Sequence, residues 1–532
     1  MEREKLGLEF IQSAKIQEIL SARTESFKIN ALNEIPHPYE LKNAKLASQI
    51  IKQAMNKKRQ ILIVGDYDVD GSLGTYIFME FFRRINYKYV NYKIPNRFKH
   101  GYGLSMEFIA DLESLPDLII TVDNGVSAFC ASKFCAERGI ELIITDHHEP
   151  QADLAQIMVN PKQKGCDFPF KEICGAFVAW YMINALKLEM GLKLDLRDLL
   201  SYVMIATIAD VMPLICLNRV IVRHGLKLLN KNNSIHALLL KSAVKSEQIN
   251  SQDIAFSIAP LINSAGRMGD ANMIVEFLLE NGIKAQNLFA KLCNLNEMRK
   301  DVTDNILAQN SQILQNEHCI IMHGNDLHQG VLGIAASKLT KLSNKNAFVL
   351  TQTQNGLKGS ARSNGKSDIF TPLLNASLNN PNIFKNFGGH KQAVGLTIDP
   401  ENLELLLDIF KTKPPEIKNN KNVVFGRIKL NQISEISNIL CEFQPFGSGF
   451  EMPLFMIEAK IIDAKIIKEK HQQFVLKDET AICKAISFYA KNFFEIDQSI
   501  SAKIEINKDG CIIREIMKSS KLSKMMGPPD LM

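Results

Sequence analysis

The chain has 532 residues, of which 46% are hydrophobic, 23% charged and 8% aromatic, and its formal net charge is +6. At about 100–200 residues per domain this length predicts roughly three or four domains, and the globular composition excludes long disorder and fibrous repeats. The small positive charge permits an anionic partner without requiring one.

The N-terminal residues are charged and lack the apolar core of a secretory signal. The ten cysteines are scattered and form no C-x-x-C pair, which argues against a zinc ribbon. We therefore expect reduced thiols and a cytoplasmic protein. The most apolar stretch, residues 199–218, contains Asp210 and the helix breaker Pro213, so we expect no membrane span.

The first half of the chain alternates short apolar runs with helical patterns. The runs are residues 60–66, 117–123 and 141–146. Helices are expected between them, at 71–85 and 126–138. Such alternation is typical of parallel βαβ units, in which the ligand site lies beyond the carboxyl ends of the strands. Each run ends in an aspartate, so we expect the aspartates to meet at one edge of a sheet.

The remaining elements complete a multidomain organisation. Residues 171–245 look mainly helical, a second α/β pattern begins near Cys319, and short alternating runs after the Pro- and Asn-rich stretch 411–422 predict a small all-β barrel. The predicted parts are an N-terminal helical segment (1–58), a parallel-sheet α/β domain (59–270), a helical linker (271–316), a smaller α/β domain (317–410), a barrel domain (423–517) and a flexible tail (518–532).

Three acids at alternate positions follow the first apolar run: Asp66, Asp68 and Asp70. Held close together, their carboxylates would repel one another and raise one another's pKa, a cost that a divalent cation removes. An aspartate-rich turn or a calcium loop are the alternatives. The calcium loop requires a glutamate at its twelfth position, where this chain has Ile77. We therefore favour a Mg²⁺ or Mn²⁺ site.

The later runs add further metal-binding side chains. Asp123 ends the second run, His147 and His148 follow Asp146 at the end of the third, and Asp210 lies near the end of an apolar helix. A buried acid without a partner would be costly. Four or more carboxylates and an imidazole exceed the needs of one open octahedral site. Two cations about 3.5–4 Å apart, sharing a bridging carboxylate and activating a water, would use them all.

These motifs carry a family resemblance. In this order and spacing, DYDVDG (66–71), VDNG (122–125), DHH (146–148) and ADVMPL (209–214) resemble the four motifs of the DHH phosphoesterase superfamily. NSAGRMGD (263–270), HQGVLGIAASKL (328–339), KGSARSNG (358–365) and FGGHKQAVGLTI (387–398) resemble the DHH-associated domain of the RecJ exonuclease family. PFGSGFEMPLF (445–455) leads into a segment similar to the RecJ OB-fold. The resemblance covers about residues 60–515.

The resemblance implies an α/β fold: a parallel-sheet DHH domain, a smaller α/β DHH-associated domain across a cleft, and a β-barrel (OB-fold) domain. RecJ enzymes are 5′→3′ exonucleases of single-stranded DNA in bacterial repair and recombination. The resemblance therefore implies a hydrolase that uses two divalent cations, Mn²⁺ or Mg²⁺, and releases 5′-mononucleotides. Its partner would be single-stranded DNA with a 5′ end. A single-strand-binding protein and a helicase are open candidates, and no membrane is expected.

The resemblance also assigns roles to residues. The implied metal ligands are Asp66, Asp68, Asp123, His147 and Asp210, with Asp123 as the bridge. His148 would be a ligand or a donor to the scissile phosphate, and Asp70 has no assigned role. The implied phosphate-binding residues are Arg267, Ser360 and Arg362 at the terminal 5′-phosphate and His390 from across the cleft. Arg97 is a further phosphate contact or a solvated loop arginine.

Aromatic residues of the barrel segment are open to two interpretations. Phe474, Phe488 and Tyr489 either stack on bases or belong to the core, and the single tryptophan, Trp180, is expected in a core helix. Two other functions compete with the RecJ interpretation. A DHH hydrolase of short oligonucleotides, cyclic dinucleotides or pyrophosphate is expected to lack the segment 423–517. A non-enzymatic replication scaffold is expected to lack the carboxylates, which this chain retains.

Overall fold

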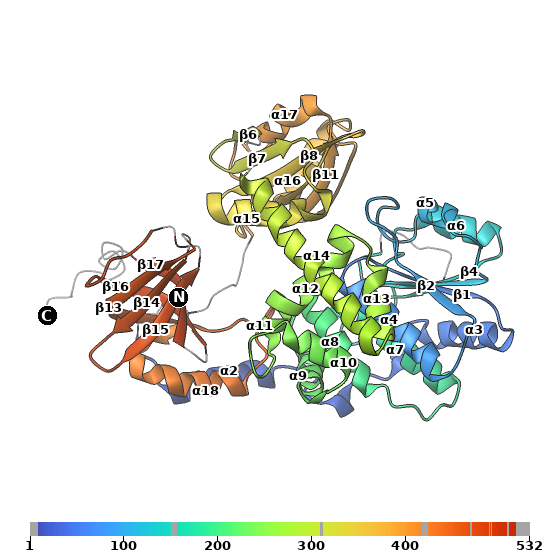
Figure 1. The fold of residues 1–532 in the computed structure, drawn as a ribbon, viewed down its shortest axis with the longest axis horizontal. Coiled ribbons are helices and arrows are strands. Elements are labelled where there is room, and N and C mark those ends of the chain that lie inside the picture. Colours follow the sequence, from blue (N-terminus) through green and yellow to red (C-terminus); the bar gives the residue numbers. More distant parts are fainter. Residues whose placement is uncertain are drawn as a thin grey trace. The chain divides into compact units, whose positions relative to one another are not determined.

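The computed structural model of the protein describes residues 9–150, 157–308, 312–417, 424–468, 471–488, 490, 492–507 and 510–517. The chain divides into two compact units. Unit 1 comprises residues 1–30, 213–216 and 420–532, and unit 2 comprises residues 31–212 and 217–419. Figure 1 shows the elements of both units.

Unit 2 begins with a five-stranded, all-parallel sheet in the order β2-β1-β3-β4-β5. Its strands are β1 (Ile61–Gly65), β2 (Val90–Lys93), β3 (Leu118–Val122), β4 (Glu141–Thr145) and β5 (Ile157–Val159). Both β1 and β3 are buried along their whole length because helices cover both faces, which explains their continuous apolar sequences. The three expected strands are confirmed.

Helices form a layer on each face of this sheet (Figure 1). The short helices α5 (Met106–Ala110) and α6 (Phe129–Glu137) pack on one face, where Leu62, Val64 and Ile119 contribute to their shared core. The helices of the opposite face are α3 (Ala44–Asn56), α4 (Val69–Arg84) and α7 (Gly175–Glu189). This leaves the carboxyl ends of β1, β3 and β4 as the edge from which the aspartates extend.

A helical region follows the parallel sheet, as expected. Its elements are α8 (Leu200–Ala209), α9 (Cys216–Lys231), α10 (Ile235–Ser242), α11 (Ser251–Asp253), the π-helical turn η5 (Ile254–Ile258), α12 (Ala259–Met268), α13 (Asn272–Leu279) and α14 (Gly282–Ala308). Short 3₁₀ turns elsewhere are η2 (Leu32–Glu34), η3 (Pro38–Glu40), η4 (Arg197–Leu199), η6 (Gln329–Val331), η7 (Pro400–Asn402) and η8 (Leu430–Gln432). Within the described ranges, no helix has the length and apolarity needed to cross a membrane.

The second sheet of unit 2 has six strands in the order β10-β11-β9-β8-β7-β6. Its strands are β6 (Gln312–Gln315), β7 (Cys319–Gly324), β8 (Asn346–Thr353), β9 (Gly356–Arg362), β10 (Asn386–His390) and β11 (Ala393–Ile398), and its helices are α15 (Leu332–Ser343), α16 (Phe370–Asn379) and α17 (Leu403–Asp408). One expectation is corrected here. Residues 312–315 were expected to be helical, but they pair with β7 as an antiparallel edge strand.

Unit 1 is a closed barrel in which β13 pairs with both β14 and β16. Its strands are β12 (Val424–Arg427), β13 (Leu454–Ile467), β14 (His471–Lys477), β15 (Ile482–Phe488), β16 (Ser499–Asn507) and β17 (Gly510–Met517). The expectation that this region is entirely β is wrong at α18 (Ile433–Glu442). Ile433, Ile436 and Leu440 recur at helical spacing and enter the barrel core.

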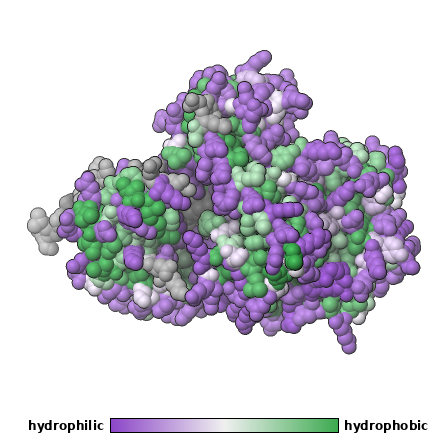
Figure 2. Space-filling view, viewed as in Figure 1, coloured by the Kyte–Doolittle hydropathy of each residue, from purple (hydrophilic) through white to green (hydrophobic). Residues whose placement is uncertain are grey.

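The N-terminal helix α2 (Ser13–Glu25) also belongs to unit 1. Its Ile16 and Leu20 are fully buried in the barrel core, and the Ile11 N–H donates a 2.9 Å hydrogen bond to the Arg427 carbonyl. The expected helical segment 1–58 is therefore divided, because α3 packs in unit 2. On the face drawn in Figure 2, hydrophilic residues cover most of the surface, and apolar residues appear as separate patches.

Candidate active site

The acidic residues of the first motif lie where β1 ends and α4 begins. Asp68 is the N-cap of α4, and its Oδ1 accepts hydrogen bonds from the backbone N–H groups of Asp70 (2.9 Å) and Gly71 (3.1 Å). A Cβ at Gly71 would lie 2.4 Å from the Asp66 nitrogen, so only glycine allows this tight turn. The turn leaves Asp66 and Asp70 buried and close to Asp68.

Asp123 occupies a strained turn at the end of β3. Its φ is +62°, which is rarely adopted by residues other than glycine and is found at functional sites. The neighbouring Asn124 holds the turn, because its Nδ2 donates to the carbonyls of Val64 (3.0 Å) and Val122 (2.9 Å). The Tyr102 hydroxyl donates to the Asp123 carbonyl at 3.0 Å. The strain is therefore supported by fixed hydrogen bonds on both sides.

Asp146 orients the two histidines that follow β4. Its Oδ1 accepts from the backbone N–H groups of His147 (2.7 Å) and His148 (3.1 Å) and lies 2.8 Å from His148 Nδ1. Burial opposes ionisation of Asp146, but the hydrogen bond and charge of His148 lower its pKa. Burial likewise opposes the charge of His148, yet the bond to Asp146 raises the His148 pKa to about 9. Asp146 thus fixes the second histidine rather than facing the other acids.

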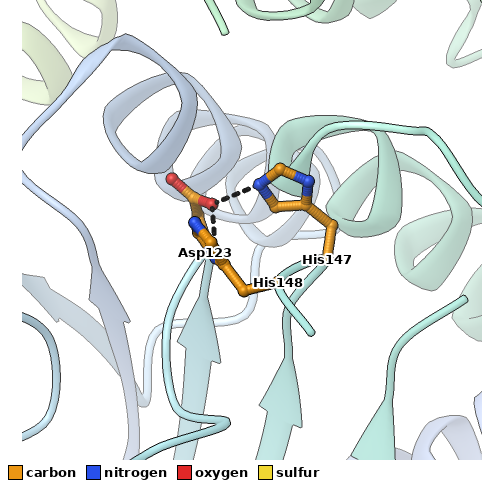
Figure 3. Close-up of side chains that lie close together, drawn as sticks. All are labelled: Asp123, His147 and His148. Carbon is orange, nitrogen blue, oxygen red and sulfur yellow. Dashed lines mark ion pairs between the residues drawn. The ribbon is translucent and has the colours of Figure 1, made fainter. Parts of the chain in front are cut away.

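Three of these side chains meet in Figure 3. The distance from Asp123 Oδ1 is 3.1 Å to His147 Nε2 and 3.8 Å to His148 Nδ1. His147 Nε2 is also 3.6 Å from Asp70 Oδ2 and 3.5 Å from Asp210 Oδ2. His147 therefore lies at the centre of the cluster, with a carboxylate on each of three sides.

The structure groups the side chains into three overlapping sets whose ligand atoms lie within 4.8 Å of one another. The sets are Asp66–Asp68–Asp123, Asp70–His147–Asp210 and Asp123–His147–His148. The five predicted ligands and His148 are thus brought together. Asp70, to which the family resemblance assigned no role, also faces His147 and Asp210. Its two oxygens accept from the N–H groups of Gly175 (2.5 Å) and Ala176 (2.7 Å) at the start of α7.

The cluster fits divalent cations. Within the described chain, no hydrogen bond is made by Asp66 Oδ1, Asp123 Oδ1, Asp210 Oδ2 or either ring nitrogen of His147, although all are buried. Burial, followed by the neighbouring carboxylates, raises the pKa of Asp66 and Asp123 well above the usual range. The same causes raise the pKa of Asp210 to about 8. Such oxygens and imidazole are the ligands that Mg²⁺ and Mn²⁺ accept.

A cavity of about 290 Å³ adjoins the acids and is basic on its other side. Arg97, Arg267 and Arg362 line it together with Asp66, Asp123 and Asp210. The Arg97 guanidinium lies 4.6 Å above the Tyr67 ring, and Arg267 Nη1 donates to the Gly330 carbonyl at 3.2 Å. Burial, then Arg97 and Arg362, lower the Arg267 pKa to about 10. An anion in the cavity would relieve this desolvation and repulsion.

Ser360 and Arg362 are presented by β9, two residues apart and therefore on the same face of the second sheet. Arg362 Nη1 donates to Ser360 Oγ at 3.1 Å. His390 is exposed at the end of β10 and is absent from the described lining of this cavity. Sequence reasoning missed Asn263, Tyr67 and Tyr102, which also line it. Asn263 and Tyr67 stood inside quoted motifs, but their side chains gave no separate signal.

The aromatic candidates of the barrel behave differently from one another. Phe474 is buried in the core of unit 1, whereas Phe488 is 49% exposed and lies edge-on to His471, with ring centroids 5.4 Å apart. Tyr489 lies outside the described residues. Trp180 is buried in α7, as expected for a core residue. Phe488 remains the one stacking candidate among these three that the structure places on the surface.

Comparison with known proteins places the chain in a family. Residues 60–207 match the DHH family, N-terminal domain; residues 315–413 match the DHHA1 domain; and residues 426–508 match the RecJ OB domain. The chain is 32% identical over 517 residues to the single-stranded-DNA-specific exonuclease RecJ of Haemophilus influenzae, and the match covers 90% of each protein. The chain belongs to the RecJ family.

Other RecJ proteins extend the similarity. The RecJ of Bacillus subtilis is 31% identical over 476 residues, covering 85% of this chain and 59% of that protein. The structure of RecJ from Thermus thermophilus in complex with Mn²⁺ superposes with a TM-score of 0.77 at 23% identity, covering 96% of this chain and 79% of the other. A manganese-bound exonuclease RecJ superposes at 0.59 and 28% identity, covering 70% of this chain and 94% of the other. The expected order of DHH, DHH-associated and OB parts is confirmed.

Proposed function

We propose that the protein is a metal-dependent exonuclease that hydrolyses single-stranded DNA from its 5′ end to 5′-mononucleotides, in DNA repair and recombination. The observation that carries the proposal is the cavity lined by a cluster of carboxylates on one side and three arginines on the other. The first side suits divalent cations, and the second suits a phosphate group. The name of the H. influenzae relative, a single-stranded-DNA-specific exonuclease, supports the same substrate.

The acidic side would hold two Mn²⁺ or Mg²⁺ ions. Asp66, Asp68 and Asp123 form one ligand set, and Asp70, His147 and Asp210 form the other. Asp123 belongs to the first set, and its Oδ1 lies 3.1 Å from Nε2 of His147 in the second, so Asp123 would be shared as the bridging ligand. When bound, such a pair of ions activates a water molecule and stabilises the charge that develops on the scissile phosphate.

His148 is suited to contact the scissile phosphate directly. It lines the cavity, and Asp146 holds its Nδ1 at 2.8 Å. The remaining ring nitrogen, Nε2, is then free to donate a hydrogen bond to a phosphate oxygen. In this role His148 orients the phosphodiester and stabilises its negative charge, while His147 belongs to the ligand set.

The arginines account for cleavage from an end. A terminal phosphomonoester carries about −1.5 to −2 charges at pH 7, more than an internal phosphodiester, so a cluster of cations favours it. Arg97, Arg267 and Arg362, with Ser360 as a hydroxyl donor, would hold this 5′-phosphate. Because the same cavity contains the acids, only a short length of strand separates the held phosphate from the bond that is cut. Release of mononucleotides follows from that spacing.

The barrel of unit 1 would bind the strand outside the cavity, as OB-folds do through basic grooves and stacking aromatics. Exposed Phe488 is the candidate for stacking. A single-strand-binding protein and a helicase are the proposed partners, because a strand must be exposed before it can be degraded. All ten cysteines are free thiols, which supports our proposal that the protein works in the cytoplasm.

The test uses a single-stranded oligonucleotide with a 5′-phosphate, carrying a label at one end or the other, incubated with the protein and Mn²⁺. Early release of labelled mononucleotide from the 5′ end, with the 3′ label on a shortening ladder, is expected. EDTA should stop the reaction. Intact DNA, or full activity after chelation, would overturn the proposal, and a dinucleotide would then be the substrate to try.

A further inference from the structure

Phe256 is an exposed aromatic residue that the site described above does not use. It exposes 81% of its surface, more than any other large apolar side chain in the described part of the chain. A single exposed apolar residue is common on protein surfaces, so the exposure alone does not indicate a partner, and its place in the helix decides the interpretation. Phe256 lies in η5, the π-helical turn that joins α11 to α12 in one continuous helix.

The sequence explains why the helix is deformed at this point. Pro260 has no N–H to donate, and its ring would clash with the carbonyl of the residue four positions earlier, which is Phe256. The helix widens instead, and the Ala259 N–H donates to the Ile254 carbonyl five residues back. Single π turns of this kind are frequent at functional sites. The helix is therefore deformed in the turn that contains Phe256.

The exposed side chain lies in line with the active-site cavity. Phe256, Pro260, Asn263 and Arg267 are spaced at i, i+4, i+7 and i+11, which places them along one face of the helix. The opposite face is buried through residues that include Ile258, Leu261, Ile262 and Ala265. Asn263 and Arg267 both line the cavity. One helix face thus runs from the cavity outward to Phe256.

Two contacts fix this helix relative to the acids. A Cβ at Gly266 would lie 2.1 Å from the Tyr67 carbonyl, so α12 packs directly against the first acidic motif. The π turn itself packs against α8, whose last residue precedes Asp210. The position of Phe256 is therefore set by the same elements that set the metal-binding side chains.

The spacing corresponds to a short length of DNA. Phe256 and Arg267 are eleven residues apart, or about 16 Å along the helix axis. A stacked strand advances about 3.4 Å per nucleotide, so this distance spans at most about five nucleotides. With the 5′-phosphate at Arg267, a strand that leaves the cavity past Asn263 would bring one of its next few bases to Phe256.

We propose that Phe256 stacks on a base of the substrate strand, three to five nucleotides from the 5′ end and on the 3′ side of the bond that is cut. This inference rests on the proposed exonuclease function and adds a binding residue outside the cavity. A base covers the ring without requiring a particular sequence, because every base has an aromatic face. The contact would hold the strand between successive cuts.

The test compares the wild type with Phe256→Ala and Phe256→Trp on two 5′-phosphorylated substrates, a 20-nucleotide strand and a dinucleotide. Loss of one stacked base is expected to raise KM for the long strand roughly five- to a hundredfold with little change in kcat, and tryptophan should restore it. The dinucleotide is too short to reach the ring, so the variants should differ far less on it. Ile283→Ala, which removes a 76% exposed side chain from α14, is the matched control.

A second measurement does not depend on turnover. With EDTA present, 2-aminopurine at positions three to five should change its fluorescence on binding the wild type, and Phe256→Ala should abolish that change at one position. An equal loss on both substrates, or a lower melting temperature, would assign Phe256 to packing and overturn the proposal. An unchanged KM on the long strand would also overturn it. An inactive wild type would instead contradict the exonuclease function itself.

Discussion

The two sides of the active-site cavity are built in opposite ways. The acidic side projects from the ends of three parallel strands and the end of α8. Most of its carboxylates are buried, and several of their oxygens make no described hydrogen bond. The basic side comes from a loop, a helix and β9. Arg97 lies over the Tyr67 ring, Arg267 donates to the Gly330 carbonyl, and Arg362 donates to the Ser360 hydroxyl.

The two sides differ in how precisely their side chains must be positioned. Metal ligands require fixed positions within a fraction of an ångström, which strand ends and capped helix starts provide. A terminal phosphate can be bound by long arginine side chains from several elements, because the guanidinium offers several donors. Both sides carry like charges that only a bound partner of opposite sign relieves. The cavity is therefore complementary to a metal-bound phosphate ester.

The largest effect is expected on the acidic side. Asp123→Asn should lower kcat by at least about a thousandfold, because the shared ligand of two ions is lost, while binding of DNA is largely retained. Steady-state rates and a binding titration with a fluorescent strand measure the two properties. Asp167→Asn changes an exposed aspartate and is the control. A variant with near wild-type kcat would remove Asp123 from the bridging position.

A substitution on the basic side is expected to change KM more than kcat. Arg362→Ala is expected to raise KM for 5′-phosphorylated strands about 10- to 100-fold, and to reduce the preference over strands with a 5′-hydroxyl. Arg362→Lys should recover only part of the loss, because an ammonium group lacks the paired donors of a guanidinium. Arg138→Ala, at an exposed position, is the comparison. Equal losses on phosphate and hydroxyl ends would mean that Arg362 does not read the 5′ end.

Stability without metal should reveal the repulsion on the acidic side. Folding raises the pKa of Asp210 from 3.8 to about 8. Between pH 4 and pH 8 the Asp210 carboxyl group therefore keeps a proton in the folded protein that it has lost in the unfolded chain. Stability in EDTA should therefore fall as the pH rises from 5 to 8 and level off above that. With Mn²⁺ it should instead be maintained or rise, because deprotonated ligands bind the ion. Melting temperatures across this range measure both, and identical slopes would contradict the assignment.

A smaller effect is expected at His390. Its side chain is exposed at the end of β10 rather than part of the described cavity lining, so His390→Ala should raise KM only about three- to tenfold. Kinetics beside Arg362→Ala on the same strand give the comparison. A loss as large as that of Arg362→Ala would show that His390 reaches the phosphate once the strand is bound.

Much of this site could be inferred from the sequence, because the carboxyl ends of parallel strands lie at the same edge of a sheet. The aspartates of the three apolar runs were expected at one edge of the sheet and lie there, although Asp146 holds His148 instead of facing the other acids. What remained out of reach depended on three-dimensional packing. Asp70 alternates with Asp66 and Asp68 in sequence, yet only the fold shows that it caps α7 and also faces His147.

The elements that were predicted wrongly from the sequence were missed for similar reasons. Strand β6 is a short, mostly exposed edge strand without a clear apolar pattern, so it could not be separated from the preceding helix. Helix α18 was missed although its apolar residues recur at helical spacing, because the alternating runs on either side of it predicted strands for the whole region. Phe256 gave no signal either, since an aromatic residue in an apolar helix is expected to be buried.

The position of α2 has a consequence for biosynthesis. Its buried Ile16 and Leu20 pack against barrel strands that are translated more than 400 residues later, so their partners do not exist when the helix leaves the ribosome. At about 5–20 residues per second, the wait is roughly half a minute to a minute and a half. During that time the helix must remain uncovered or be held by a chaperone. The barrel core becomes complete only after α2 and all the strands from β12 to β17 have been translated.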